Sequence, residues 1–195
     1  MNSTILEAQA LTKTYRQTTA LDHINLKLER EKIYGFIGQN GAGKTTFLRL
    51  ITGLAFPSGG SLTLWGQSGD AQLQVQRKRI GCMIETPALL NMPELLILDE
   101  PINGLDPAGI VEIRNLLKSL NKEYGMTILV SSHILEELYQ TASEFILIDK
   151  GKIIEELSGR ELDERCRRHI AIRTEHPEKT QHQFNLSCLH IVSSP

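Results

Sequence analysis

The residue pattern with the most specific chemistry lies at positions 38–46, where the loop contains every fixed position of the phosphate-binding pattern G-x-x-x-x-G-K-[ST]. Its glycines let backbone N–H groups turn toward a bound anion, and a helix that begins at Lys44 adds the positive end of its dipole. Lys44 supplies a full charge to the outer phosphates of a nucleotide, and Thr45 supplies a hydroxyl to Mg²⁺. We therefore assign phosphate binding to these residues: Gly38, Asn40, Gly41, Ala42, Gly43, Lys44, Thr45 and Thr46.

This loop needs a strand before it and a helix after it, and the sequence provides both. The apolar run at 33–37 predicts a buried strand, and the spacing of apolar residues at 47–51 predicts a helix. Upstream, apolar and polar residues alternate at 24–29, as in half-buried antiparallel strands. Downstream, predicted strands alternate with predicted helices, which favours a parallel sheet. We predict an α/β fold of the P-loop, RecA-like class with a mostly parallel sheet and an N-terminal antiparallel flank.

After residue 100, helices and a hairpin are predicted from the residues that begin and end them. Asp106-Pro107 is a strong helix start, Gly125 closes that helix, and five apolar residues form its predicted inner face: Ile110, Ile113, Leu116, Leu117 and Leu120. A hairpin is predicted at 145–154 around the turn at Lys150-Gly151. Ser158 and Glu161 have the spacing of a capping box that opens a further helix.

Length and composition limit the possible functions. At 195 residues the chain suits one domain with a small appendage, and we place the boundary between 1–157 and 158–195. The net charge of −2 gives no reason to expect nucleic acid as a partner. Three cysteines without a C-x-x-C pattern predict reduced thiols. No apolar run reaches the ~20 residues of a membrane-spanning helix, so a membrane role would require a partner.

Two acidic residues end a second apolar strand at 95–98. Asp99 at such an edge can reach the Mg²⁺ held by Thr45, and the adjacent Glu100 can polarise an attacking water. Only a pair of carboxylates gives both functions.

Together these features resemble the ATP-binding subunit of an ABC transporter over nearly the whole chain, with 95–100 similar to its Walker B strand. The segment 104–107 resembles the D-loop, which in the family runs along the dimer seam. His133 resembles the switch histidine that contacts the γ-phosphate, so the resemblance assigns catalysis to Lys44, Glu100 and His133. Tyr15 resembles the aromatic residue that stacks on adenine, and the less favoured alternative is a structural tyrosine at a strand end.

The resemblance also suggests a subfamily and its partners. Glu85 stands where the family usually has the glutamine of the Q-loop, and we include it in the nucleotide site. The run at 80–88 most resembles the subunits of bacterial exporters of the bacitracin and lantibiotic resistance type. This implies ATP and Mg²⁺ as cofactors, with a membrane-spanning permease and a second ATP-binding subunit as partners. The expected location is cytoplasmic, on the inner face of the membrane through the permease.

One part of the family pattern is missing. The family places a helical subdomain and a signature motif of the L-S-G-G-Q kind before Walker B, but only residues 86–93 separate Glu85 from Glu94. A parallel crossover needs roughly a dozen residues or more, so either a segment is absent near 90–93 or the flanking strands form an antiparallel hairpin. The similar run at 157–161 comes too late in the chain to be the signature.

We therefore expect a chain that binds ATP, hydrolyses it poorly and does not couple hydrolysis to transport. A non-hydrolysing remnant or regulatory protein is the first alternative. A soluble ABC-type ATPase is the second, although the long arms or tandem cassettes usual for that class are not present.

Overall fold

A computed structural model describes the backbone of residues 3–83, 93–166, 170–174 and 189–193. Glu85 and residues 90–92, where the missing segment is predicted, lie outside the described residues. The chain divides into two compact units, residues 1–159 and 160–195, and the candidate site lies in the first. Within the part that the structure describes, no helix combines the length and apolar character needed to cross a bilayer.

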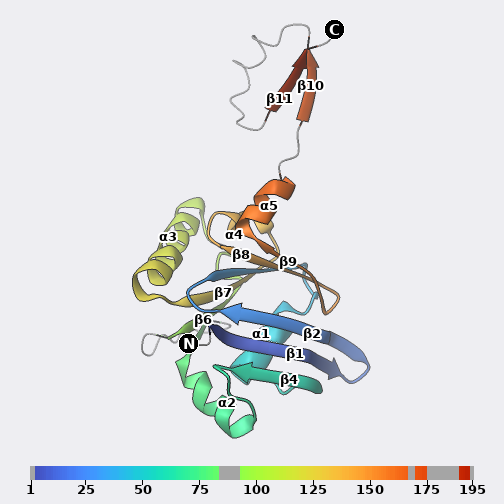
Figure 1. Cartoon of the computed structure of the whole chain (residues 1–195), viewed down its shortest axis with the longest axis vertical. Coiled ribbons are helices and arrows are strands. Elements are labelled where there is room, and N and C mark those ends of the chain that lie inside the picture. The colour runs from blue at the N-terminus through green and yellow to red at the C-terminus, as the bar shows by residue number, and fades with distance from the viewer. Residues whose placement is uncertain (1–2, 84–92, 167–169, 175–188, 194–195) are drawn as a thin grey trace. The chain divides into compact units, whose positions relative to one another are not determined.

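The first unit contains a six-stranded sheet in which every neighbouring pair is parallel except β8 and β9. Strands β6, β7, β8 and β9 of this sheet are labelled in Figure 1. Its order is β5-β6-β7-β3-β8-β9. The bounds are β3 (Ile33–Ile37), β5 (Ile80–Met83), β6 (Leu95–Asp99), β7 (Thr127–Ser132), β8 (Glu144–Asp149) and β9 (Lys152–Ser158). All residues of β3 and β7 are buried, as expected for parallel strands covered on both faces.

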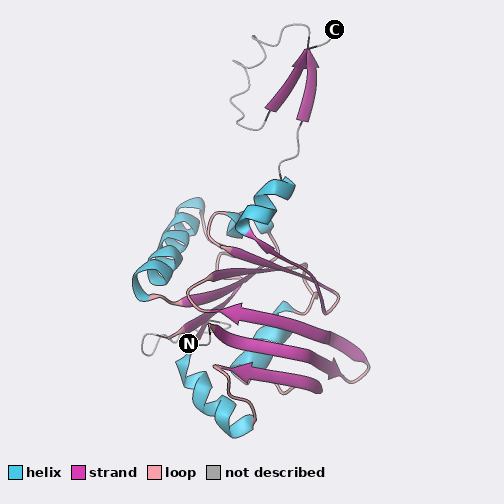
Figure 2. Ribbon diagram, in the orientation of Figure 1, coloured by secondary structure: helices cyan, strands magenta, loops and turns pink. Residues whose placement is uncertain are grey.

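A second, antiparallel sheet is built from the N-terminal part of the chain, with the order β2-β1-β4 (Figure 2). Its strands are β1 (Thr4–Tyr15), β2 (Thr18–Glu29) and β4 (Gly59–Leu64). Helix α1 (Lys44–Thr52) contributes Phe47, Leu48, Leu50 and Ile51 to a core that also contains side chains of both sheets. The predicted fold class is confirmed.

Helix α3 (Pro107–Tyr124) begins and ends where the sequence predicts. The Asp106 carboxylate accepts a hydrogen bond from the Gly109 N–H at 2.9 Å, and Gly125 ends the helix with a φ of 61°. The predicted inner face was partly wrong, because Leu117 is buried but Leu116 is 51% exposed. These neighbours project about 100° apart, and only Leu117 lies on the stripe that faces the sheet.

The remaining elements are short. They are α2 (Asp70–Gln76), the 3-10 turn Arg77–Arg79, α4 (Leu135–Tyr139), α5 (Gly159–Cys166), β10 (Ile170–Thr174) and β11 (Leu189–Ser193). Helix α5 begins directly after Ser158, where the capping-box spacing predicts a helix start. In the second unit, β10 and β11 pair in parallel.

Strands β5 and β6 are parallel neighbours, with Gly81 opposite Leu96, so the antiparallel-hairpin alternative is wrong. Only residues 84–94 connect the two strands. A parallel crossover ordinarily takes a dozen residues or more, usually with a helix. The connection is therefore shorter than the sheet topology normally requires.

A charged cluster lies beside this connection. The Arg79 guanidinium donates to both carboxylate oxygens of Glu94, at 2.7 and 2.6 Å, and Arg30 donates to the same carboxylate at 3.0 Å. Partial burial raises the pKa of the Glu94 carboxyl, but hydrogen bonds and charge from Arg79, and then from Arg30, lower it below its ordinary value.

A lowered carboxyl pKa means that the native state favours the charged form, so its contribution to stability is present near neutral pH and is lost as the pH falls through the acidic range. We expect Glu94→Gln to lower the free energy of unfolding at pH 7 and to have a smaller effect at pH 3. Urea unfolding of both proteins at the two pH values measures this difference. An equal effect at both would contradict the role of the ionised carboxylate.

Two glycines with nearly equal φ angles give a matched test of packing between β1 and β4. Gly60 and Gly66 have φ values of 75° and 76°, but a Cβ at Gly60 would lie 2.2 Å from the Ala10 carbonyl oxygen, whereas one at Gly66 would meet nothing within 4 Å. Both alanine variants carry the left-handed backbone cost, and only Gly60→Ala adds the clash. We expect Gly60→Ala to be less stable than Gly66→Ala by about 1–3 kcal/mol in urea unfolding. Equal losses would show that the strands relax freely.

Candidate nucleotide site

The glycine-rich loop forms a concave cradle between β3 and α1. The first bond of the helix runs from the Phe47 N–H to the Gly43 carbonyl, so the N–H groups of Lys44, Thr45 and Thr46 precede the helical hydrogen-bond pattern. A cavity of about 200 Å³ lies there, lined by Ala20, Asn40, Gly41, Gly43, Lys44, Thr45, Thr46 and Glu100. Donors at a helix start are suited to bind an anion.

Two assigned loop residues, Gly38 and Ala42, do not line the cavity and instead pack the loop against the rest of the protein. Ala42 is buried, and its carbonyl accepts a hydrogen bond from the Gly151 N–H at 2.9 Å. A Cβ at Gly38 would lie 2.3 Å from the Ile148 carbonyl oxygen, so only glycine fits there without movement. Gly38 and Ala42 thus pack the loop against the end of β8 and the turn that follows it, while the other assigned loop residues line the cavity.

Two oxygen atoms that can bind a metal ion meet at one end of the cradle. The Thr45 hydroxyl donates a hydrogen bond to Asp99 Oδ2 at 2.7 Å. Magnesium binds oxygen ligands at about 2.0–2.1 Å in an octahedron, in which neighbouring ligands lie about 3 Å apart. Thr45 and Asp99 therefore fit Mg²⁺ as two adjacent ligands with little movement.

The three residues assigned to catalysis by resemblance form a continuous chain of contacts. Lys44, which is 5% exposed, donates to the Gly38 carbonyl at 2.6 Å and lies 3.3 Å from Glu100 Oε1. The other oxygen of Glu100 lies 3.2 Å from His133 Nδ1. Glu100 has a φ of 48°, in the left-handed region. A phosphate that reaches Lys44 must compete with the Glu100 carboxylate.

His133 is held by the turn that follows β7. The Ser132 hydroxyl donates to the Glu137 carboxylate at 2.6 Å and accepts from the Ile134 N–H at 3.0 Å. These bonds fix the backbone on both sides of His133, so the imidazole projects from a defined turn.

Two of the assigned residues are not part of this arrangement. Tyr15 does not line the cavity, is 44% exposed at the end of β1, and has Lys13 Nζ 4.7 Å from its ring centroid. Glu85 lies outside the described residues. Adenine stacking on Tyr15 and nucleotide contact by Glu85 stay predictions.

The sequence interpretation missed two residues of the site. Ala20, on β2, lines the cavity, and its carbonyl oxygen would lie 2.7 Å from a Cβ at Gly43. Ser131 is fully buried, and its hydroxyl donates to Asp99 Oδ1. The available signal for Ser131 was a pair of serines at the end of an apolar strand.

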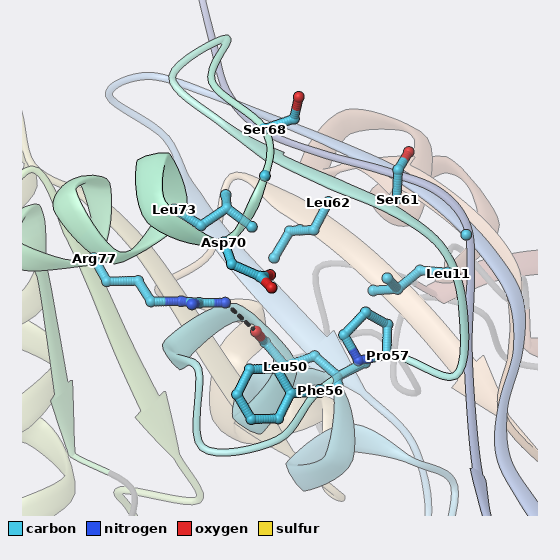
Figure 3. Close-up of a pocket in the computed structure, with 12 residues that line it drawn as sticks. Leu11, Leu50, Phe56, Pro57, Ser61, Leu62, Ser68, Asp70, Leu73 and Arg77 are labelled. Atoms are coloured by element: carbon cyan, nitrogen blue, oxygen red, sulfur yellow. Dashed lines mark hydrogen bonds between the residues drawn. The ribbon is translucent and has the colours of Figure 1, made fainter.

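A further cavity, of about 310 Å³, lies between β4, α1 and α2 (Figure 3). Its lining is mainly apolar, with Phe56, Leu62 and Leu73 among the contributors. The guanidinium of Arg77 is already bound to the last turn of α1, at 3.2 Å from the Leu50 carbonyl. The one cationic side chain among the described residues that line this cavity is therefore already engaged.

Comparison with known proteins finds relatives that are all ATP-binding proteins of transporters. The sequence profile described as "ABC transporter" matches residues 21–91. The bacitracin transport ATP-binding protein BcrA of Enterococcus faecalis is 34% identical, over 85% of this chain and 73% of that protein. The lantibiotic transport ATP-binding protein SrtF of Streptococcus pyogenes is 32% identical, over 77% of this chain and 89% of that protein.

The fold has close solved counterparts as well. The structure of cbiO1 from Clostridium perfringens, part of the ABC transporter complex cbiONQ, superposes with a TM-score of 0.75 at 21% identity, over 94% of this chain and 97% of that chain. The alignment with BcrA spans 224 positions, more than the 195 residues of this chain. It must therefore pass over residues of BcrA that have no counterpart here.

The contact between Glu100 and Lys44 predicts the behaviour of a charge-neutral variant. Glu100→Gln should raise ATP affinity about 3- to 10-fold, because it removes a competitor for Lys44 and relieves about 1 kcal/mol of repulsion between a carboxylate and phosphate. Titration with a fluorescent ATP analogue measures this change. Glu123→Gln, which removes an exposed carboxylate from α3, serves as the control and should leave the affinity unchanged. Weaker binding by Glu100→Gln would contradict the competition.

Proposed function

Because the chain belongs to the ATP-binding proteins of ABC transporters, we propose that it binds ATP with Mg²⁺ as the energy-coupling subunit of a bacterial exporter. The observation that carries this proposal is the convergence of Lys44, Thr45, Asp99, Glu100 and His133 on one phosphate cradle. The phosphate loop, the acidic pair Asp99 and Glu100, and His133 lie at the ends of three different strands, β3, β6 and β7. Their meeting at one place supports a nucleotide site better than any of the motifs taken singly.

Each residue has a proposed role, which for the residues of the cradle is supported by their positions. Lys44 and the N–H groups at the start of α1 bind the outer phosphates, and Thr45 and Asp99 would hold Mg²⁺, which would supply positive charge beside the phosphates. Glu100 polarises the attacking water, and His133 contacts the γ-phosphate from the turn after β7. Tyr15 and Glu85 complete the proposed nucleotide contacts.

The names of the relatives suggest the exported substrate. BcrA is a bacitracin transport protein and SrtF a lantibiotic transport protein. We therefore propose peptide antibiotics as the transported class, with resistance or immunity as the purpose. A membrane-spanning permease would bring the subunit to the cytoplasmic face of the membrane.

A second ATP-binding subunit is the other proposed partner. The D-loop at 104–107 is exposed, which suits a segment that lies along a dimer seam. In the family, each phosphate loop faces the signature motif of the partner subunit. In other phosphoryl-transfer enzymes, the loss of a catalytic group that a partner supplies lowers the rate on the order of 10³-fold or more. With residues 84–94 as the whole connection between β5 and β6, this chain would supply no such motif to a partner.

We expect the purified chain to bind ATP and to turn it over far below the ~1 s⁻¹ at the low end of ordinary enzyme turnover. Binding of a fluorescent analogue and phosphate release are measured separately on the same preparation. Lys44→Ala should lower the affinity by about 100-fold, because a buried charge directed at phosphate is lost. Turnover of about 1 s⁻¹ or faster would contradict the poor hydrolysis, and absent binding would contradict the site itself.

The same measurements separate the alternatives. A non-hydrolysing remnant or regulatory protein would bind ATP without any phosphate release, even with an added permease and partner subunit. A soluble ABC-type ATPase would hydrolyse ATP without stimulation by membranes that contain the permease.

A further inference from the structure

We propose that Ser131 is a positioning residue of this site, which orients Asp99 toward Mg²⁺ and holds the backbone of Glu100. The inference rests on the proposed binding of ATP and Mg²⁺. It concerns a side chain that does not line the cavity of the phosphate cradle and belongs to none of the motifs assigned above.

The location of Ser131 calls for an explanation. It is fully buried in the central strand β7, after the apolar residues 128–130. A hydroxyl in such a position is costly unless it is hydrogen-bonded. In the ladder between β6 and β7, Ser131 stands directly opposite Asp99.

Both hydrogen-bonding capacities of this hydroxyl are directed at the acidic pair. It donates its single proton to Asp99 Oδ1 and accepts from the Glu100 N–H at 3.0 Å. The same N–H also lies 3.2 Å from the Ser131 carbonyl oxygen. One buried side chain therefore contacts two consecutive residues that act at the site.

The consequence for Asp99 is a fixed carboxylate. Its Oδ2 faces Thr45 at 2.7 Å, on the side where Mg²⁺ fits, while its Oδ1 is held by Ser131. With one oxygen held, the carboxylate cannot turn both oxygens away from the metal position. Hydrogen bonds of this kind to a metal ligand commonly change metal affinity by about 10- to 100-fold.

The consequence for Glu100 is a fixed backbone turn. Its φ of 48° is one that residues other than glycine rarely adopt. The two bonds from its N–H to Ser131 stabilise this conformation, which places the carboxylate 3.3 Å from Lys44 and 3.2 Å from His133. Without the hydroxyl, an extended backbone at Glu100 becomes more accessible.

Thr127 provides a matched control on the same strand. It is also buried, and its hydroxyl also accepts a backbone N–H, from Glu31 at 2.9 Å, but at the opposite end of β7. Thr127→Val and Ser131→Ala each remove one buried hydroxyl and leave one backbone N–H without that acceptor. A general loss of stability should affect both variants, whereas a loss of positioning should affect Ser131→Ala alone.

The experiment compares the dissociation constant of a fluorescent ATP analogue in Mg²⁺ and in EDTA for the full chain and both variants, together with their unfolding midpoints. We expect Ser131→Ala to reduce the Mg²⁺-dependent gain in affinity about 10-fold, with affinity in EDTA changed less than about twofold. Thr127→Val should lower the unfolding midpoint and leave the Mg²⁺-dependent gain in affinity unchanged. If Ser131→Ala does not fold, Ser131→Cys takes its place, because a thiol is a weak donor and acceptor.

The outcomes separate this inference from the function on which it rests. A full Mg²⁺ gain in Ser131→Ala, or in Ser131→Cys, overturns the positioning role and leaves ATP binding intact. Equal losses of the gain in Ser131→Ala and Thr127→Val also overturn it, since the effect would then be one of general stability. An unaltered chain that binds no ATP analogue overturns the proposed function, and the positioning role with it.

Discussion

The site depends on the register of three parallel strands. Strands β6, β7 and β3 pair so that Asp99 stands opposite Ser131 and Ser132 opposite Ile37, and all three strands end at the same edge of the sheet. The phosphate loop, the acidic pair and the histidine turn therefore emerge side by side. Because the side-chain period of a strand is two, a slip of one residue in β6 would turn Asp99 to the other face and remove it from Thr45.

Most of this framework could be predicted from the sequence, because it follows from strong local signals. The loop pattern, the apolar strands at 33–37 and 95–98 and the helix start at Asp106 each depend on a few neighbouring residues, and the structure contains the corresponding elements. The proximity of Asp99 to Thr45 could also be predicted, since carboxyl ends of parallel strands meet at one edge.

The parts that could not be predicted depend on packing between distant segments. Ser131 gives no periodic signal, and its importance follows only from the pairing with β6. The exposure of Leu116 depends on which stripe of α3 meets the sheet, which helix periodicity alone does not decide. The direction of β5 relative to β6 was left open because the connection is too short for an ordinary crossover, and only the ladder between Gly81 and Leu96 decided it.

The turn between β8 and β9 gives the phosphate loop a support outside its own motif. The Gly151 N–H donates to the Ala42 carbonyl, and the Gly151 carbonyl accepts from the Asp22 N–H at 2.8 Å. A Cβ at Gly151 would lie 2.7 Å from the Ala20 carbonyl oxygen. The loop is thus supported by a residue that does not line the cavity. The resonance and exchange rate of the Gly151 amide proton consequently report on the phosphate loop, because both depend on its hydrogen bond to Ala42.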